Sequence, residues 1–122
     1  MKQVLLVFVG GGIGSVLRYV IGKASSPLSV GFPWGTFSVN IIGSLSIGIF
    51  MGIALKNNYF SENQILLLVT GLCGGFTTFS TFGLDLYGLL QKGSWLPATS
   101  YFLANFFGTL IFIWLGFRTA SF

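Results

Sequence analysis

The chain has 122 residues, of which 53% are hydrophobic and only 7% charged, and its mean hydropathy is +0.88. Soluble domains carry about 25% charged residues, so the composition excludes a soluble globular protein and indicates an integral membrane protein. The formal net charge is +4, but the basic residues are scattered singly, which argues against nucleic acid as a partner.

Four apolar stretches follow one another, at about residues 4–22, 34–54, 65–90 and 96–117. Each reaches the ~20 residues that a helix needs to cross about 30 Å of hydrocarbon. The first follows Lys2 like a signal peptide, but it has no cleavage-type segment after it, so we expect it to remain as a span. The sequence therefore predicts an all-α membrane protein with one four-helix transmembrane domain, residues 1–122, that is bound to the lipid bilayer.

The third stretch contains the most unusual segment, residues 71–82, with the sequence GLCGGFTTFSTF. Two adjacent glycines and four hydroxyl residues in an apolar run predict a helix that breaks near residues 74–78 and then restarts. Freed backbone is tolerated at membrane depth only where protein buries it or where it lines a water-filled cavity. Broken helices also supply ion sites in membrane proteins, so this segment predicts an ion pathway.

Polar residues recur at helical spacing elsewhere in the predicted spans. They are Thr36, Asn40 and Ser44 in the second, Tyr101, Asn105 and Thr109 in the fourth, and Ser80 and Thr81 beyond the break. Such stripes either form interhelical hydrogen bonds, worth about 1 kcal/mol or less each, or line a route. The combination with a broken helix favours a route. Asp85 is the one carboxylate inside the spans, whereas cation pathways usually have acidic rings, so the residues favour a small anion.

Two further features of the break concern ions. Phe79 and Phe82 are three residues apart and share a helix face, and the positive edges of their rings suit weak binding of an anion. Backbone carbonyls released at Gly74 and Thr77 would instead be hard-oxygen ligands for an alkali cation. We interpret such a cation as structural rather than transported.

The basic residues give almost no orientation signal. Lys2, Lys56 and Arg118 fall on one side of the membrane; Lys23 and Lys92 fall on the other, with Arg18 if it reaches that interface from the end of the first span. Because an excess of Lys and Arg in cytoplasmic loops sets orientation, we predict insertion in both orientations and an antiparallel homodimer. Small residues four apart, such as Gly10 with Gly14 and Gly48 with Gly52, are typical of closely packed membrane helices.

Three motifs resemble the Fluc (CrcB-like) fluoride ion channel family, and the resemblance extends over essentially the whole chain. They are residues 11–14 (GGIG) followed by Arg18-Tyr19, residues 35–40 (GTFSVN) with Gly43, and residues 74–82 (GGFTTFSTF). The resemblance implies a passive channel of the cell (inner or plasma) membrane that exports fluoride from the cytoplasm down its electrochemical gradient. It also implies a dual-topology homodimer with two antiparallel pores and a central structural sodium ion.

The resemblance assigns roles to individual residues along the pore. Phe79 and Phe82 are similar to paired pore phenylalanines whose ring edges meet the anion. Asn40 resembles an amide that supports those rings and donates toward fluoride. Ser80 and Thr81 resemble a track of hydroxyl groups along the second half of the third helix.

The resemblance also places residues at the edges of the pore and at the sodium site. Tyr101 is similar to a tyrosine near the pore, and Arg18 to an arginine near the aqueous entrance. Gly74 and Thr77 resemble the residues whose backbone carbonyls hold sodium. Two positions depart from the family pattern: Gly83 stands where many relatives carry a hydroxyl, and Asp85 where they often carry glutamate, which leaves the role of Asp85 open.

Other functions fit less well. A small dual-topology multidrug or guanidinium exporter shares the helix number and length, but it needs a carboxylate in its first helix, where this chain has Arg18. In a purely structural subunit the polar stripes would serve packing alone. An enzyme is not expected, because no nucleophile stands beside a base and the sequence contains no histidine.

Overall fold

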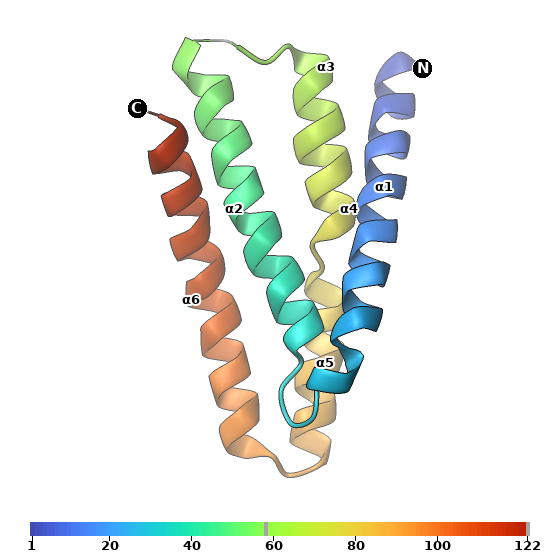
Figure 1. The fold of residues 1–122 in the computed structure, drawn as a ribbon, viewed down its shortest axis with the longest axis vertical. Coiled ribbons are helices and arrows are strands. Elements are labelled where there is room, and N and C mark those ends of the chain that lie inside the picture. The colour runs from blue at the N-terminus through green and yellow to red at the C-terminus, as the bar shows by residue number, and fades with distance from the viewer. Residues whose placement is uncertain (58, 122) are drawn as a thin grey trace.

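The computed structural model describes residues 1–57 and 59–121, and every regular element in this part of the chain is helical. Four helical segments are long and apolar enough to cross a membrane: Lys2–Leu28, Trp34–Lys56, Glu62–Gln91 and Trp95–Ala120. They contain the four predicted stretches, so the prediction of an all-α membrane protein is confirmed. Figure 1 shows both termini at the same end of the bundle as the connection between α2 and α3, as an even number of spans requires.

The first, second and last spans are each built on one long helix. Helix α1 (Lys2–Ser25) runs into the 3₁₀ turn η1 (Ser26–Leu28), and α2 (Trp34–Asn57) follows a loop that contains Gly31 at φ 84°. Helix α6 (Trp95–Ala120) follows a turn that contains Gly93 at φ 70°. Positive φ values favour glycine, which has no Cβ to clash with the backbone. Both turns therefore depend on glycine at these positions.

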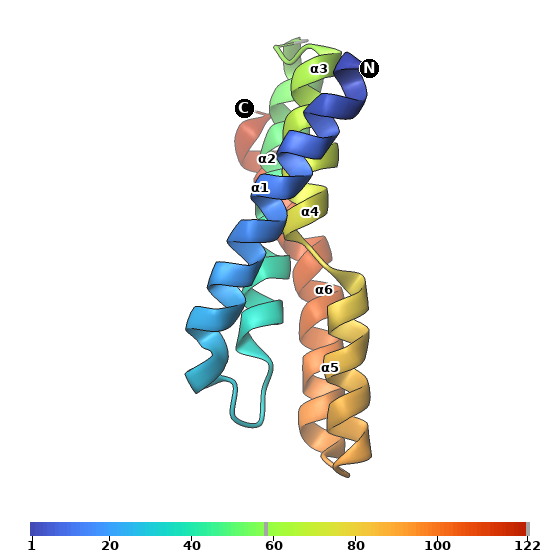
Figure 2. The same cartoon turned by 90° about the vertical axis from the view of Figure 1, so that its right-hand side faces the viewer.

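The third span consists of several elements. Helix α3 (Glu62–Ile65) begins with a capping box and continues into the π-helical segment η2 (Leu66–Cys73) and the short helix α4 (Gly74–Phe76). Helix α5 (Phe79–Gln91) completes the span. Figure 2 shows that α5 leaves the line of α3 and α4 and runs beside α6, while the end of α1 lies apart from that pair.

Two extended residues separate α4 from α5. Thr77 has φ −78° and ψ 158°, and Thr78 has φ −153° and ψ 121°. They fall within the range 74–78, where the sequence predicts a break, but the expected cause is wrong in one respect. Gly74 and Gly75, which suggested the break, are both helical. The backbone leaves the helix at the two threonines that follow.

The glycines instead allow helices to approach closely. A Cβ atom on Gly75 would lie 2.4 Å from the Gly11 carbonyl oxygen, and one on Gly14 would lie 2.2 Å from the Leu72 carbonyl oxygen. Backbone therefore packs directly on backbone where α1 meets η2 and α4. The same holds between α2 and α6, where a Cβ on Gly48 would lie 2.2 Å from the Ile113 carbonyl oxygen. The interpretation of Gly14 and Gly48 as close-packing positions is confirmed.

Candidate ion pathway

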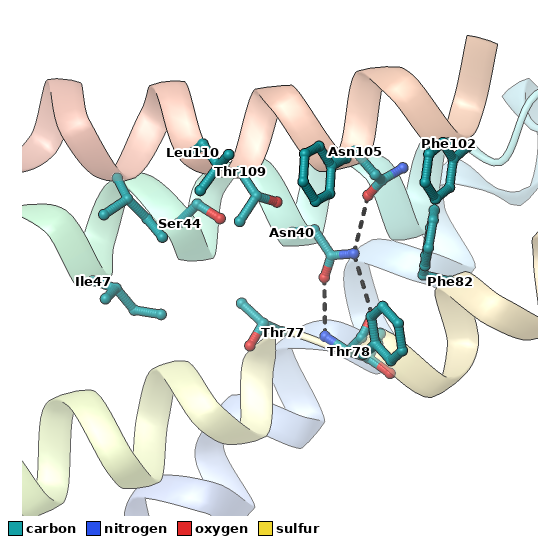
Figure 3. A pocket seen from close by; sticks show the side chains of 13 residues that line it. Asn40, Ser44, Ile47, Thr77, Thr78, Phe82, Phe102, Asn105, Thr109 and Leu110 are labelled. Atoms are coloured by element: carbon teal, nitrogen blue, oxygen red, sulfur yellow. Dashed lines mark hydrogen bonds between the residues drawn. The ribbon is translucent and has the colours of Figure 1, made fainter. Parts of the chain in front are cut away.

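A groove lies between α2, α6 and the link from α4 to α5, with a cavity volume of about 370 Å³ (Figure 3). Its polar lining residues are Asn40, Ser44, Thr77, Thr78, Asn105 and Thr109, and its aromatic ones are Phe79, Phe82, Phe102 and Phe106. Two members of each expected stripe, Asn40 with Ser44 and Asn105 with Thr109, thus line one groove, whereas Thr36 and Tyr101 do not. We call this cavity the groove.

The Asn40 side chain of α2 forms hydrogen bonds with both the backbone N–H and the backbone carbonyl of Thr78. The Thr78 N–H donates to Asn40 Oδ1 at 2.9 Å, and Asn40 Nδ2 donates to the Thr78 carbonyl oxygen at 3.2 Å. A continuous helix would direct the Thr78 N–H to the Gly74 carbonyl. The Asn40 amide therefore replaces helical pairing at this point and releases the Gly74 carbonyl from it.

Asn105 of α6 is the second partner of that amide. Asn40 Nδ2 donates to Asn105 Oδ1 at 3.1 Å, and Asn105 Nδ2 donates to the Tyr101 carbonyl oxygen at 3.2 Å. Since a primary amide has two N–H groups, both N–H groups of Asn40 are engaged within the chain. Donation from Asn40 to fluoride, as the resemblance implies, would require one of these bonds to be exchanged.

A second polar contact links α2 and α6 one helical turn from Asn40 and Asn105. It is mediated by the Asp85 carboxylate of α5. Its Oδ2 atom accepts from the Thr36 hydroxyl at 2.6 Å and from the Tyr101 hydroxyl at 3.1 Å. Tyr101 is fully buried, with 0% of its surface exposed. The shorter Asp85 side chain therefore reaches two partners, and all three groups form one partly buried cluster.

Beside this cluster lies a second cavity of about 540 Å³, at the end of the molecule that holds the loop between α1 and α2. Thr36 and Asp85 line it, together with Lys92 at the end of α5. The Asp85 cluster thus borders this cavity, and the ring of Phe82 lies next to the Tyr101 ring, with 5.2 Å between the ring centroids. Phe82 also lines the groove, so its ring stands between the groove and the Asp85 cluster.

The two predicted pore phenylalanines lie together at the start of α5. Their ring centroids are 5.7 Å apart with an interplanar angle of 39°. Their burial differs sharply, because Phe82 is 7% exposed and Phe79 is 84% exposed. Phe82 is thus fixed by its neighbours, whereas the Phe79 ring projects from this chain.

Hydroxyl groups cap the N-terminus of α5. Thr78 Oγ1 accepts from the Thr81 N–H at 3.1 Å, donates to Thr81 Oγ1 at 3.1 Å and lies 3.3 Å from Ser80 Oγ. Ser80 and Thr81, the two residues predicted to form a hydroxyl track, are both exposed. Thr78 joins them to the Asn40 amide, and sequence reasoning did not assign it a role of its own.

Carbonyl oxygens near the break are contacted by α1. Arg18 Nη1 donates to the Thr77 carbonyl oxygen at 3.3 Å, and the Ser15 hydroxyl donates to the Gly75 carbonyl oxygen at 3.4 Å. On the other side α2 touches Thr77 directly, because a Cβ on Gly43 would lie 2.2 Å from Thr77 Cγ2. The break is therefore held from both neighbouring helices. Arg18, expected near an aqueous entrance, contacts the break itself.

Sequence reasoning identified the polar stripes but not the hydrogen-bond partners of their residues. The i, i+4 spacing of Thr36 with Asn40 and of Tyr101 with Asn105 was the available signal, and it is what aligns the two polar contacts across α2 and α6. The role of Asp85 as the shared acceptor came only from the structure.

The amino-acid sequence of the chain matches one family of known proteins. The sequence profile described as "CrcB-like protein, Camphor Resistance (CrcB)" matches residues 5–117. A protein of Azobacteroides pseudotrichonymphae named fluoride-specific ion channel FluC is 41% identical, covering 100% of this chain and 98% of its own. Proteins of the same name from Chloroflexus aurantiacus and Bacteroides fragilis are 43% and 45% identical, covering 95% and 90% of this chain.

Proposed function

Because this chain belongs to the CrcB-like family, whose curated relatives are named fluoride-specific ion channels, we propose that it is a passive, fluoride-selective ion channel. It is an ion channel rather than an enzyme, and a multi-pass membrane protein. We place it in the cell membrane, where it exports fluoride from the cytoplasm down its electrochemical gradient. The observation that carries the proposal is the extended backbone at Thr77 and Thr78, which borders a groove lined by hydroxyl, amide and aromatic groups.

The proposed route uses weak sites rather than one tight site. The polar cavity beside Lys92 and Asp85 is the entrance at one end, and Lys92 raises the local concentration of anions there. Beyond it the ring edges of Phe79 and Phe82 and the hydroxyls of Ser80 and Thr81 replace part of the hydration shell. Conduction requires sites that are favourable enough to enter and weak enough to leave, which uncharged donors and ring edges satisfy.

A second copy of the chain would complete the route. The groove is bounded by α2, α6 and the α4–α5 link, and the Phe79 ring on its margin is 84% exposed. Small residues and exposed aromatic side chains on a membrane helix are suited to burial against a partner helix. We propose an antiparallel homodimer, in keeping with the balanced distribution of Lys and Arg, in which each copy contributes to two antiparallel pores.

A structural sodium ion at the dimer axis is part of the proposal. The Gly74 carbonyl is released from helical pairing, since the Thr78 N–H donates to Asn40. The Thr77 carbonyl accepts from Arg18, and a carbonyl oxygen has a second lone pair for a cation. Two such carbonyls from each of two chains would give four hard-oxygen ligands, so this donor set fits an alkali cation. The ion would hold the two breaks together without moving along the route.

Fluoride efflux from proteoliposomes tests the function directly. Purified protein is reconstituted into vesicles loaded with potassium fluoride, valinomycin sets the potential, and a fluoride-selective electrode records efflux. We expect fast fluoride efflux and, in matched vesicles, little chloride efflux. Vesicles that hold fluoride, or that instead show proton flux stimulated by guanidinium, would overturn the proposal and favour an assembly subunit or an exporter.

A further inference from the structure

We propose that Asn105 is a positioning residue for the ion pathway, because its side-chain amide fixes the Asn40 amide, which in turn holds the extended backbone at Thr78. As far as fluoride passage is concerned, this rests on the function proposed above. Asn105 comes from α6 and Thr78 from the α4–α5 link, so the contact joins the last span to the break through α2 (Figure 3).

The orientation of each amide follows from groups that can act in only one way. A backbone N–H only donates and a carbonyl only accepts, so the Thr78 N–H must face Asn40 Oδ1 and the Thr78 carbonyl must face Nδ2. The second N–H of Asn40 then needs an acceptor, which is Asn105 Oδ1 at 3.1 Å. Asn105 Nδ2 in turn meets the Tyr101 carbonyl, at 3.2 Å. Every donor in this chain of bonds meets an acceptor.

The reverse orientation of Asn40 is unfavourable at three contacts. Rotating its amide by 180° would place Nδ2 against the Thr78 N–H, Oδ1 against the Thr78 carbonyl, and Oδ1 against Asn105 Oδ1 unless Asn105 also rotates. Asn105 cannot rotate freely, because its Nδ2 would then leave the Tyr101 carbonyl. It is 4% exposed, so water cannot readily replace the lost partner. Asn105 therefore opposes loss of the two hydrogen bonds between the Asn40 amide and the Thr78 backbone, which we call the clamp.

The clamp also determines which groups at the break remain available to an ion. While Asn40 holds Thr78, the Gly74 carbonyl stays outside helical pairing and Thr78 Oγ1 stays in place to cap α5. Phe79 and Ser80 follow directly on that cap. A relaxed clamp would allow the Thr78 N–H to return to the Gly74 carbonyl and the first turn of α5 to change direction, so the ring edges would lose their placement.

Two variants of Asn105 separate this role from simple packing. Asn105→Leu keeps the number and branching of the side-chain heavy atoms and removes the amide oxygen and nitrogen, and Asn105→Ser leaves a hydroxyl too short to reach Asn40 but small enough to be tolerated. We expect each to lower fluoride efflux by about tenfold, the equivalent of one or two lost hydrogen bonds in a membrane. Ser100→Ala, which removes an exposed side-chain bond from the same helix, is the control and should leave efflux unchanged.

Coupling to Asn40 is the decisive readout. If Asn105 acts through Asn40, then Asn105→Leu should change efflux by less than about twofold in an Asn40→Ala background, because the interaction is already lost. Independent effects that multiply in the double variant would overturn the proposal. So would an efflux within twofold of the unmodified protein for both single variants.

Hydrogen exchange at the Thr78 amide tests the clamp without any flux measurement. By NMR in micelles, Asn105→Leu should speed exchange of that amide by about tenfold or more, since its acceptor loses support. Asn105→Asp keeps an acceptor facing Asn40, so the amide should stay protected even where the added charge lowers fluoride efflux. Unchanged exchange in Asn105→Leu would refute the clamp. If the unmodified protein carried no fluoride, the proposed function would fail while this measurement would still decide the role of Asn105.

Discussion

Replacing Gly14 by alanine tests whether α1 must lie directly against the backbone of the third span. The added methyl group would lie 2.2 Å from the Leu72 carbonyl oxygen and 2.7 Å from the Phe76 nitrogen. The shorter distance is about 1.2 Å less than the 3.4 Å at which ordinary contacts begin. Both neighbours are backbone atoms of a packed helix, so the strain is relieved only if α1 moves away.

The magnitude follows from comparison with Gly12, two residues earlier. A methyl group on Gly12 meets nothing within 4 Å among the described residues, so Gly12→Ala has the same gain in helix propensity without the clash. Overpacking in a well-packed interior costs about 1–3 kcal/mol. Since the propensity gain is common to both variants, Gly14→Ala should be less stable than Gly12→Ala by about 1–3 kcal/mol.

Reversible unfolding in mixed micelles of a mild detergent and dodecyl sulfate, followed by tryptophan fluorescence, measures this difference. A retreat of α1 would also lengthen the bonds from Arg18 to the Thr77 carbonyl and from Ser15 to the Gly75 carbonyl, which are already 3.3 and 3.4 Å long. We therefore expect lower fluoride efflux from Gly14→Ala at equal amounts of folded protein. Equal stability of the two alanine variants would refute the reasoning, because α1 could then not be in backbone contact with the third span.

Three further predictions concern the route and the assembly. Phe79→Ile and Phe82→Ile should each cut fluoride efflux by more than about tenfold while the protein still elutes as a folded species, because size is kept and the positive ring edge is lost; normal efflux from both would exclude the aromatic role. Asn40→Asp loses two donors and places a carboxylate oxygen about 3 Å from the Thr78 carbonyl oxygen. Fluoride efflux should therefore fall by about 30-fold or more. The same change at Asn63, near the start of α3, is the control and should have little effect on efflux. Two lysines added at the N-terminus should fix one orientation and abolish efflux until a copy fixed in the opposite orientation is co-expressed; full activity from the single fixed form would rule out the antiparallel dimer.

Much of the fold followed from composition and spacing. The lengths of the four apolar stretches and the low charge determine a four-span helical protein, because a backbone in hydrocarbon must satisfy its own hydrogen bonds. The four-residue spacing of Gly10 and Gly14 likewise predicted close helix packing, which the contacts with η2 bear out. The interruption of the third span falls in the predicted range 74–78, but of the residues that suggested it the two glycines are helical, and the extended backbone is at Thr77 and Thr78.

What the sequence determined by itself is a set of periodic patterns: which residues are apolar enough to span, and which polar residues share a helix face. These are properties of one helix at a time. Only the tertiary structure decided that Asn40 pairs with Thr78 and Asn105, and that Asp85 accepts from both Thr36 and Tyr101. Each of those contacts joins different elements of the fold, and all but the Asp85–Tyr101 bond join residues at least 38 positions apart. They depend on crossing angles and on close helix contacts at glycine, such as Gly48 against the Ile113 carbonyl, which local periodicity does not encode.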